Sequence, residues 1–164
     1  MTHMEKIKIL YLEDSPRVRE EMEAFLQSLY GNRVELYMAG DLLSFDEMLY
    51  EWGETYDKII VDLGINRLTE ISDEVYENFW KDKAGRQPEL YQGIPMEGWD
   101  YYSRVMRTAP LTANRGKDIL LLSGYAEIMG AQVSPNDLPA GRKDRLLSKG
   151  DEAFERKLRV FLES

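Results

Sequence analysis

Short apolar strands alternate with helical segments along this chain, and that alternation restricts the chain to few folds. The strand candidates are residues 6–12, 34–38, 58–62, 118–122 and 146–148. The run at 58–62, Lys-Ile-Ile-Val-Asp, has an unbroken apolar centre, which is typical of a parallel strand buried on both faces. Strands joined by helices form right-handed crossovers. We therefore expect a three-layer α/β domain with helices on both faces of a parallel sheet.

Capping residues mark the expected helix ends. Ser15 and Pro16 suit the N-cap and first position of a helix that Gly31 would close. Ser44 could cap a second helix that ends near Gly53. Residues 98–107 also read as helical, and a last helix begins at about residue 151. The apolar stripes of the three capped or terminal helices are Val18, Met22, Phe25, Leu26 and Leu29; Phe45, Met48, Leu49 and Trp52; and Phe154, Leu158, Phe161 and Leu162.

Length and charge narrow the functional classes. The 164 residues, 43% of them hydrophobic, suit a single domain over residues 5–164. The chain has no cysteine, which fits a reducing compartment, and no apolar run spans a membrane, so a cytoplasmic protein is expected. A net charge of -9 disfavours direct binding to nucleic acid.

Polar residues follow four of the expected strands. Glu13 and Asp14 follow the first strand, Asp62 ends the third, Ser123 follows the fourth and Lys149 the fifth. In an open parallel sheet the carboxyl ends of the strands meet at the ligand-binding edge. Crowded carboxylates repel one another unless a hard cation such as Mg²⁺ joins them. A lysine and a hydroxyl beside the ion would suit a phosphoryl group.

Five segments in this order resemble the response-regulator receiver family. They are residues 9–15 (Ile-Leu-Tyr-Leu-Glu-Asp-Ser), 57–63, 95–99 (Pro-Met-Glu-Gly-Trp), 119–124 and 147–149. The resemblance covers about three-quarters of the chain. It implies a flavodoxin-like fold, with five parallel strands in the order 2-1-3-4-5.

The resemblance also implies a role for each residue of the site. Asp62 would accept a phosphoryl group from a histidine kinase or a histidine phosphotransfer protein, and the chain would signal through contacts with a downstream protein. Lys149 and Ser123 would bind the phosphoryl oxygens. The Mg²⁺ ligands would be the carboxylates of Glu13, Asp14 and Asp62 and the backbone carbonyl of Gly64.

Three features depart from the family pattern. Asp62 and Gly98 are 36 positions apart (98 minus 62), where the family has fewer than about ten. The extra residues, approximately 66–94, include a helix that Ser72 opens, with Val75, Tyr76, Phe79 and Trp80 as its apolar residues. These side chains either pack on the domain or form a binding loop or lid. Leu146 stands where receivers usually have an aromatic residue, and residues 129–145 are too rich in Gly and Pro for a regular helix.

Two other functions stay open at this stage. A receiver-like module that binds partners without phosphorylation is compatible with the extra segment and with Leu146. A Mg²⁺-dependent phosphohydrolase is disfavoured by Gly64, because aspartate-nucleophile phosphatases place a second acid two residues after the first. Whether the chain counts as an enzyme is left undecided by the sequence.

Overall fold

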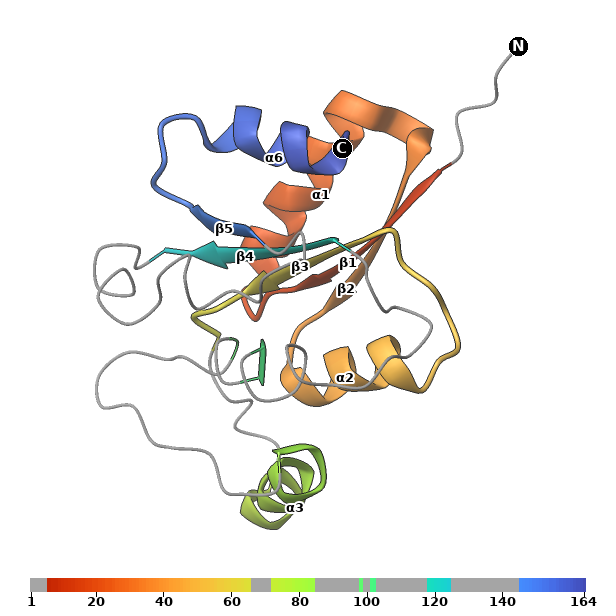
Figure 1. Ribbon diagram of the computed structural model, residues 1–164, viewed down its shortest axis with the longest axis vertical. Coiled ribbons are helices and arrows are strands. Elements are labelled where there is room, and N and C mark those ends of the chain that lie inside the picture. The colour runs from red at the N-terminus through yellow and green to blue at the C-terminus, as the bar shows by residue number, and fades with distance from the viewer. Residues whose placement is uncertain (1–5, 66–71, 85–97, 99–100, 103–117, 125–144) are drawn as a thin grey trace.

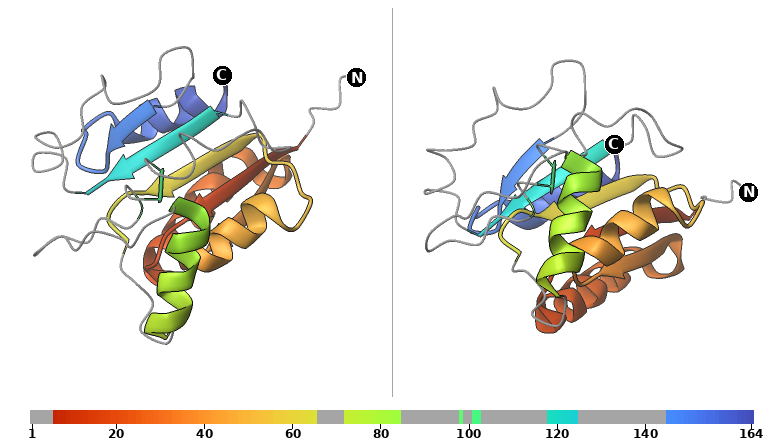
Figure 2. Two further views of the ribbon diagram at one scale, coloured as in Figure 1. Left: turned by 60° about the horizontal axis from the view of Figure 1, so that its bottom comes forward. Right: turned by 90° about the horizontal axis from the view of Figure 1, so that it is seen from below.

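Five parallel strands form one sheet in the order β2-β1-β3-β4-β5 (Figures 1 and 2). The computed structural model describes residues 6–65, 72–84, 98, 101–102, 118–124 and 145–164. The strands are β1 (Ile7–Leu12), β2 (Val34–Ala39), β3 (Lys58–Asp62), β4 (Asp118–Ser123) and β5 (Arg145–Ser148). The strand order and the parallel pairing that the sequence predicted are confirmed.

Helices cover both faces of this sheet. The helical elements are α1 (Pro16–Tyr30), the short 3-10 helix η1 (Gly31–Arg33), α2 (Leu42–Tyr50), α3 (Asp73–Ala84) and α6 (Phe154–Leu162). Figure 1 shows α1 and α6 on one face, with α2 and α3 on the other. The three-layer arrangement is therefore confirmed. None of the helices that the structure describes is long and apolar enough to cross a lipid bilayer.

The expected boundaries of α1 are confirmed at both ends. The hydroxyl of Ser15 accepts a hydrogen bond from the amide of Val18 at 3.3 Å, and Pro16 opens the helix. Gly31 follows the last residue with φ +56°, a left-handed conformation that glycine adopts without the strain a side chain would cause. These local signals place Glu13, just upstream of the cap, at the junction between β1 and α1.

The expected start of α2 was wrong. Asp41, not Ser44, is the N-cap, and its carboxylate accepts hydrogen bonds from both the amide and the hydroxyl of Ser44, each at 2.8 Å. A carboxylate at this end is further stabilised by the helix dipole. The helix begins three residues earlier than expected and ends at Tyr50, and Trp52 lies beyond it with 53% of its surface exposed. Trp52 is therefore not part of the buried stripe.

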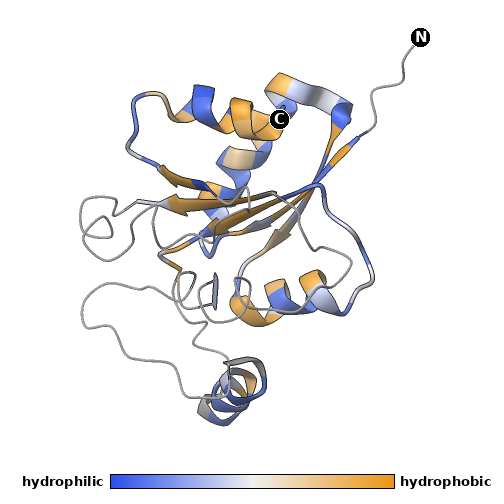
Figure 3. Cartoon of the chain, in the orientation of Figure 1, coloured by the Kyte–Doolittle hydropathy of each residue, from blue (hydrophilic) through white to orange (hydrophobic). Residues whose placement is uncertain are grey.

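β3 is the central strand, and all five of its residues are buried. Its Ile59 and Val61 belong to the core beneath α2, whereas Ile60 belongs to the core beneath α1 and α6. Figure 3 shows the strands as the most hydrophobic elements and the helices as two-sided. The buried ammonium of Lys58, at the amino end, donates to the carbonyl oxygen of Ser164 at 3.0 Å. The prediction of a strand buried on both faces is confirmed.

The extra segment after β3 contains α3, which packs on the domain through its aromatic residues. Tyr76 and Trp80 are buried in the core beneath α2, and Phe79 stacks on Tyr101 with ring centroids 6.2 Å apart. Ser72 caps the helix by accepting from the amide of Val75 at 3.3 Å. Val75, the apolar residue of this helix that is not aromatic, is 49% exposed. Most of the expected helix at 98–107 and the segment 129–145 lie outside the described residues.

Candidate functional site

Acidic and basic side chains from three strands meet at the carboxyl end of the sheet. β1 ends just before Glu13, β3 ends in Asp62, and Lys149 follows β5. Side chains two residues apart on a strand point to the same face. Asp62 therefore shares the face of Ile60, which packs in the core beneath α1 and α6. The parallel register brings the strand ends together although Glu13 and Lys149 are 136 residues apart.

Lys149 bridges two buried carboxylates. Its ammonium nitrogen lies 3.1 Å from Oε2 of Glu13 and forms a close ion pair with Oδ2 of Asp62. Glu13 and Asp62 are 3% and 4% exposed, respectively. Backbone amides hold the remaining oxygens, because Gly64 donates to Oδ1 of Asp62 at 2.8 Å and Ser15 to Oε1 of Glu13 at 3.1 Å. Each carboxylate oxygen therefore has a fixed donor.

The charges at this site do not balance when both acids are ionised. Burial, together with a hydrogen bond to Asp62 and repulsion by its charge, raises the pKa of Glu13 to about 8. Burial opposes the charged form of Lys149, but the carboxylates of Asp62 and Glu13 raise its pKa above the usual value. One ammonium thus faces two carboxylates. Additional positive charge would therefore stabilise the ionised form of both carboxylates.

A hydroxyl and a glycine complete the same edge. Ser123, the last residue of β4, is 2% exposed, and its backbone carbonyl accepts from the amide of Lys149 at 2.8 Å. Gly124 is exposed, and a Cβ added there would lie 3.9 Å from Cδ of Lys149. The structure therefore brings Ser123, Gly124 and Lys149 together beside Asp62.

The donor set suits a hard cation in part. Glu13 and Asp62 are adjacent, and a divalent ion would compensate the negative charge of Asp62 that, after burial, helps to raise the pKa of Glu13. Asp14 follows Glu13 directly and is half-buried. Across the described ranges, however, no three His, Cys, Asp or Glu residues gather as a metal-binding group. Glu13, Asp14 and Asp62, all within the described residues, therefore do not form such a group.

Several contacts at this site were not foreseen from the sequence. The guanidinium of Arg19 donates to the backbone carbonyl of Glu13 at 2.6 Å and so fixes the chain at the acid. Gly98 lies against the end of β3, because a Cβ added there would overlap the carbonyl oxygen of Asp62 and lie 2.8 Å from Cα of Leu63. Tyr11 is buried two residues before Glu13. Only Tyr11 could have been inferred, because it shares the strand face of Glu13.

Comparisons with known proteins found similarity at the level of structure. No family model and no curated protein sequence matches the chain. A receiver domain of a sensor histidine kinase from Pseudomonas aeruginosa, described with a magnesium ion in the active-site cleft, is 18% identical, with a TM-score of 0.51. That match covers 97% of this chain and 99% of the other.

Two further solved structures resemble the chain to a similar degree. A response regulator receiver domain from Clostridium thermocellum gives a TM-score of 0.54 at 16% identity, over 96% of this chain and 91% of that one. A signal receiver domain of a DNA-binding response regulator from Colwellia psychrerythraea gives 0.53 at 16% identity, over 97% and 100% of the two chains. The similarity extends over nearly the whole length in each case.

Proposed function

We propose that this chain, which has the fold of response-regulator receiver domains, is itself a phosphoryl-accepting receiver with Asp62 as the acceptor. The observation that supports this most is the buried carboxylate of Asp62 at the carboxyl end of the central strand, held by the Lys149 ammonium. Ionisable groups with perturbed pKa values, such as Glu13 and Lys149 beside this acid, cluster at functional sites.

The proposed reaction transfers a phosphoryl group from a phosphohistidine. An Asp62 carboxylate oxygen attacks the phosphorus in line, a phosphorus–oxygen bond forms as the phosphorus–nitrogen bond breaks, and the imidazole leaves. Water later hydrolyses the acyl phosphate, which restores the carboxylate and releases inorganic phosphate. The Gly64 amide, 2.8 Å from Oδ1, fixes the orientation of the carboxylate before the attack.

The residues that would hold Mg²⁺ are Glu13, Asp14, Asp62 and the carbonyl of Gly64. With the three acids ionised and Lys149 protonated, the net charge of these side chains is -2 (three negative charges and one positive). A divalent cation would neutralise that charge and the charge that develops on the phosphoryl oxygens.

Lys149 and Ser123 would then bind the product. Lys149 would move from the two carboxylates to a phosphoryl oxygen, while the Ser123 hydroxyl and the Gly124 amide would donate to another. The phosphoryl donor would be a histidine kinase or a histidine phosphotransfer protein in the cytoplasm. The output would pass through contacts with a downstream protein, because the charge of -9 disfavours direct contact with nucleic acid.

A receiver-like module that works without phosphorylation is the second candidate. Leu146 favours it. This half-buried side chain packs against the core beneath α2, and it has no polar group that could form a hydrogen bond and change position when a phosphoryl group binds. Such a module would keep the fold and bind its partner in a single state.

Binding of beryllofluoride, an analogue of the phosphoryl group, separates the two candidates. The receiver should give a bound ¹⁹F NMR signal that requires Mg²⁺ and that Asp62→Asn removes. Asp57→Asn is the matched control, because Asp57 lies just before the other end of β3, where its carboxylate accepts from the amide of Lys8 at 2.8 Å. No bound signal from the wild-type chain would favour the module that works without phosphorylation.

A further inference from the structure

Tyr11 carries a buried hydroxyl group for which the described part of the chain offers no formed hydrogen bond. Its side chain is fully buried in β1, and among the described residues its hydroxyl has no partner in bonding geometry. Buried hydroxyl groups in folded proteins are almost always paired. An unpaired one beside a functional site therefore calls for a physical explanation.

The position of Tyr11 places this hydroxyl beside the two acids. Tyr11 and Glu13 are alternate residues of one chain and so share a face of the sheet. Tyr11 also pairs in register with Ile60, and the next residue of β3 on that face is Asp62. Burial raises the pKa of Tyr11, and the charges of Glu13 and Asp62 with a near contact to Glu13 raise it further. The geometry stops short of a hydrogen bond.

The oxygens of Glu13 are occupied while Lys149 bridges the acids. Oε1 accepts from the Ser15 amide at 3.1 Å, and Oε2 accepts from the Lys149 ammonium at 3.1 Å. In the proposed reaction Lys149 leaves for a phosphoryl oxygen, so the Glu13 carboxylate loses this donor, and a Mg²⁺ ion bound to Glu13 would take only one of its lone pairs. A buried carboxylate oxygen with an open acceptor site is unfavourable. Tyr11 holds a free donor on the same face.

We propose that Tyr11 is a positioning residue whose hydroxyl donates to Glu13 when Lys149 moves to the phosphoryl group. This inference rests on the proposed function, since it describes what Glu13 does after phosphoryl transfer. Tyr11 would keep the Glu13 carboxylate oriented in the phosphorylated state and would be unpaired only in the unphosphorylated one.

A pocket beside Tyr11 gives the ring and the lysine room to move. Tyr11, Leu122 and Lys149 line a volume of about 290 Å³ together with side chains from α1 and α6. A small shift of the ring or of the Lys149 stem therefore needs no movement of the strands.

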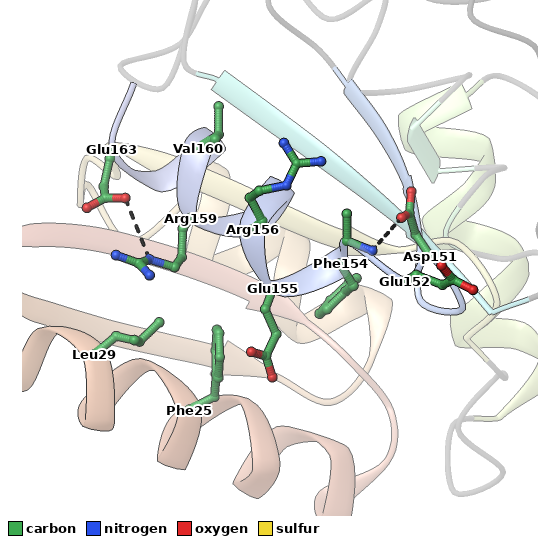
Figure 4. A pocket seen from close by; sticks show the side chains of 11 residues that line it. Phe25, Leu29, Asp151, Glu152, Phe154, Glu155, Arg156, Arg159, Val160 and Glu163 are labelled. Carbon is green, nitrogen blue, oxygen red and sulfur yellow. Dashed lines mark hydrogen bonds and ion pairs between the residues drawn. The ribbon is translucent and has the colours of Figure 1, made fainter.

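The pocket is also connected to the molecular surface. It shares Phe25, Phe154 and Glu155 with a larger groove of about 840 Å³ between α1 and α6. Figure 4 shows Phe25 of α1 below Phe154 and Glu155 of α6.

The test compares Tyr11→Phe with Tyr30→Phe. Tyr30 is a matched control, because it is also buried and its hydroxyl also lacks a formed hydrogen bond, but it lies beside Arg33 and Lys58 at the amino end of β3. Beryllofluoride with Mg²⁺ is titrated into each chain. We expect Tyr11→Phe to weaken binding roughly tenfold, as for the loss of a hydrogen bond to a charged group. Tyr30→Phe should match the wild type, and the effect of Tyr11→Phe should shrink in a Glu13→Gln background.

A second measurement follows the hydroxyl itself. In protein labelled with ¹³Cζ tyrosine, hydroxyl hydrogen exchange of Tyr11 should slow when beryllofluoride binds, and the signal is assigned from Tyr11→Phe. If the wild type binds beryllofluoride but Tyr11→Phe binds equally well and exchange is unchanged, the role of Tyr11 is overturned and the proposed function stands. If the wild type binds none, the proposed function fails and this inference fails with it.

Discussion

Gly98 lies directly against the backbone carbonyl of Asp62, although the two residues are 36 positions apart in the sequence (98 minus 62). The chain therefore leaves the end of β3, forms α3 and returns to the residue it left. The approach is close enough that only a residue without a side chain fits.

Gly98→Ala should therefore destabilise the fold. The added Cβ would overlap the Asp62 carbonyl oxygen, and the neighbouring atoms are backbone, which cannot rotate away. We expect a loss of about 1–3 kcal/mol in the free energy of unfolding, measured by urea denaturation. Gly150→Ala is the control, since its Cβ would meet only the Ser148 hydroxyl at 3.7 Å. Equal stability of the two variants would contradict this account of the contact.

The stability of the metal-free protein should fall as the pH rises. Burial next to Asp62 raises the pKa of Glu13 from 4.5 to about 8. A folded state that holds a proton more tightly than the unfolded state is favoured at low pH. The contribution of Glu13 is thus fully present below 4.5 and is lost as the pH rises through about 8.

Thermal melting in EDTA between about pH 6 and pH 9 measures this effect. The wild-type melting temperature should decline across that range, and Glu13→Gln should remove most of the decline, because its amide does not titrate there. A decline of equal size in both proteins would assign the effect to other groups.

Removing the buried tryptophan of α3 should lower the free energy of unfolding of the whole domain, because this helix contributes to its core. Trp80 is fully buried in the core beneath α2, so Trp80→Ala should cost about 3–5 kcal/mol of unfolding free energy. Val75→Ala on the exposed side of the same helix should change it by less than about 0.5 kcal/mol. A single cooperative urea transition is expected. A small effect of Trp80→Ala would mean that α3 contributes little to the core.

The sequence predicted the sheet because its signals are local and agree with one another. The Ile-Ile-Val centre of β3 favours a buried strand, and the Ser15–Pro16 pair favours a helix start; neither pattern favours a second local structure. Asp41 and Ser44 are both good caps three residues apart, and local preference alone cannot choose between them. In the structure Asp41 is the cap, and Trp52 lies exposed beyond the end of α2.

The sequence could predict which strand ends form the candidate site. It could not predict which side-chain atoms contact one another there. Parallel strands bring Glu13, Asp62 and Lys149 to one edge, whatever the details of their packing. Which oxygen Lys149 contacts, how deeply Glu13 is buried and which hydroxyl is left unpaired depend on side-chain packing across β1 and β3. The hydroxyl of Tyr11 is a case of this kind, because nothing in a strand pattern distinguishes a paired tyrosine from an unpaired one.

Intact-mass spectrometry after treatment with acetyl phosphate and Mg²⁺ tests the central claim, that Asp62 accepts a phosphoryl group. The wild-type chain should gain the mass of one phosphoryl group, and hydroxylamine, which cleaves acyl phosphates, should remove it. Asp62→Asn should gain nothing, while the control Asp57→Asn should behave as the wild type. An adduct on both the wild type and Asp62→Asn, or on neither, would contradict the assignment of Asp62 as the acceptor.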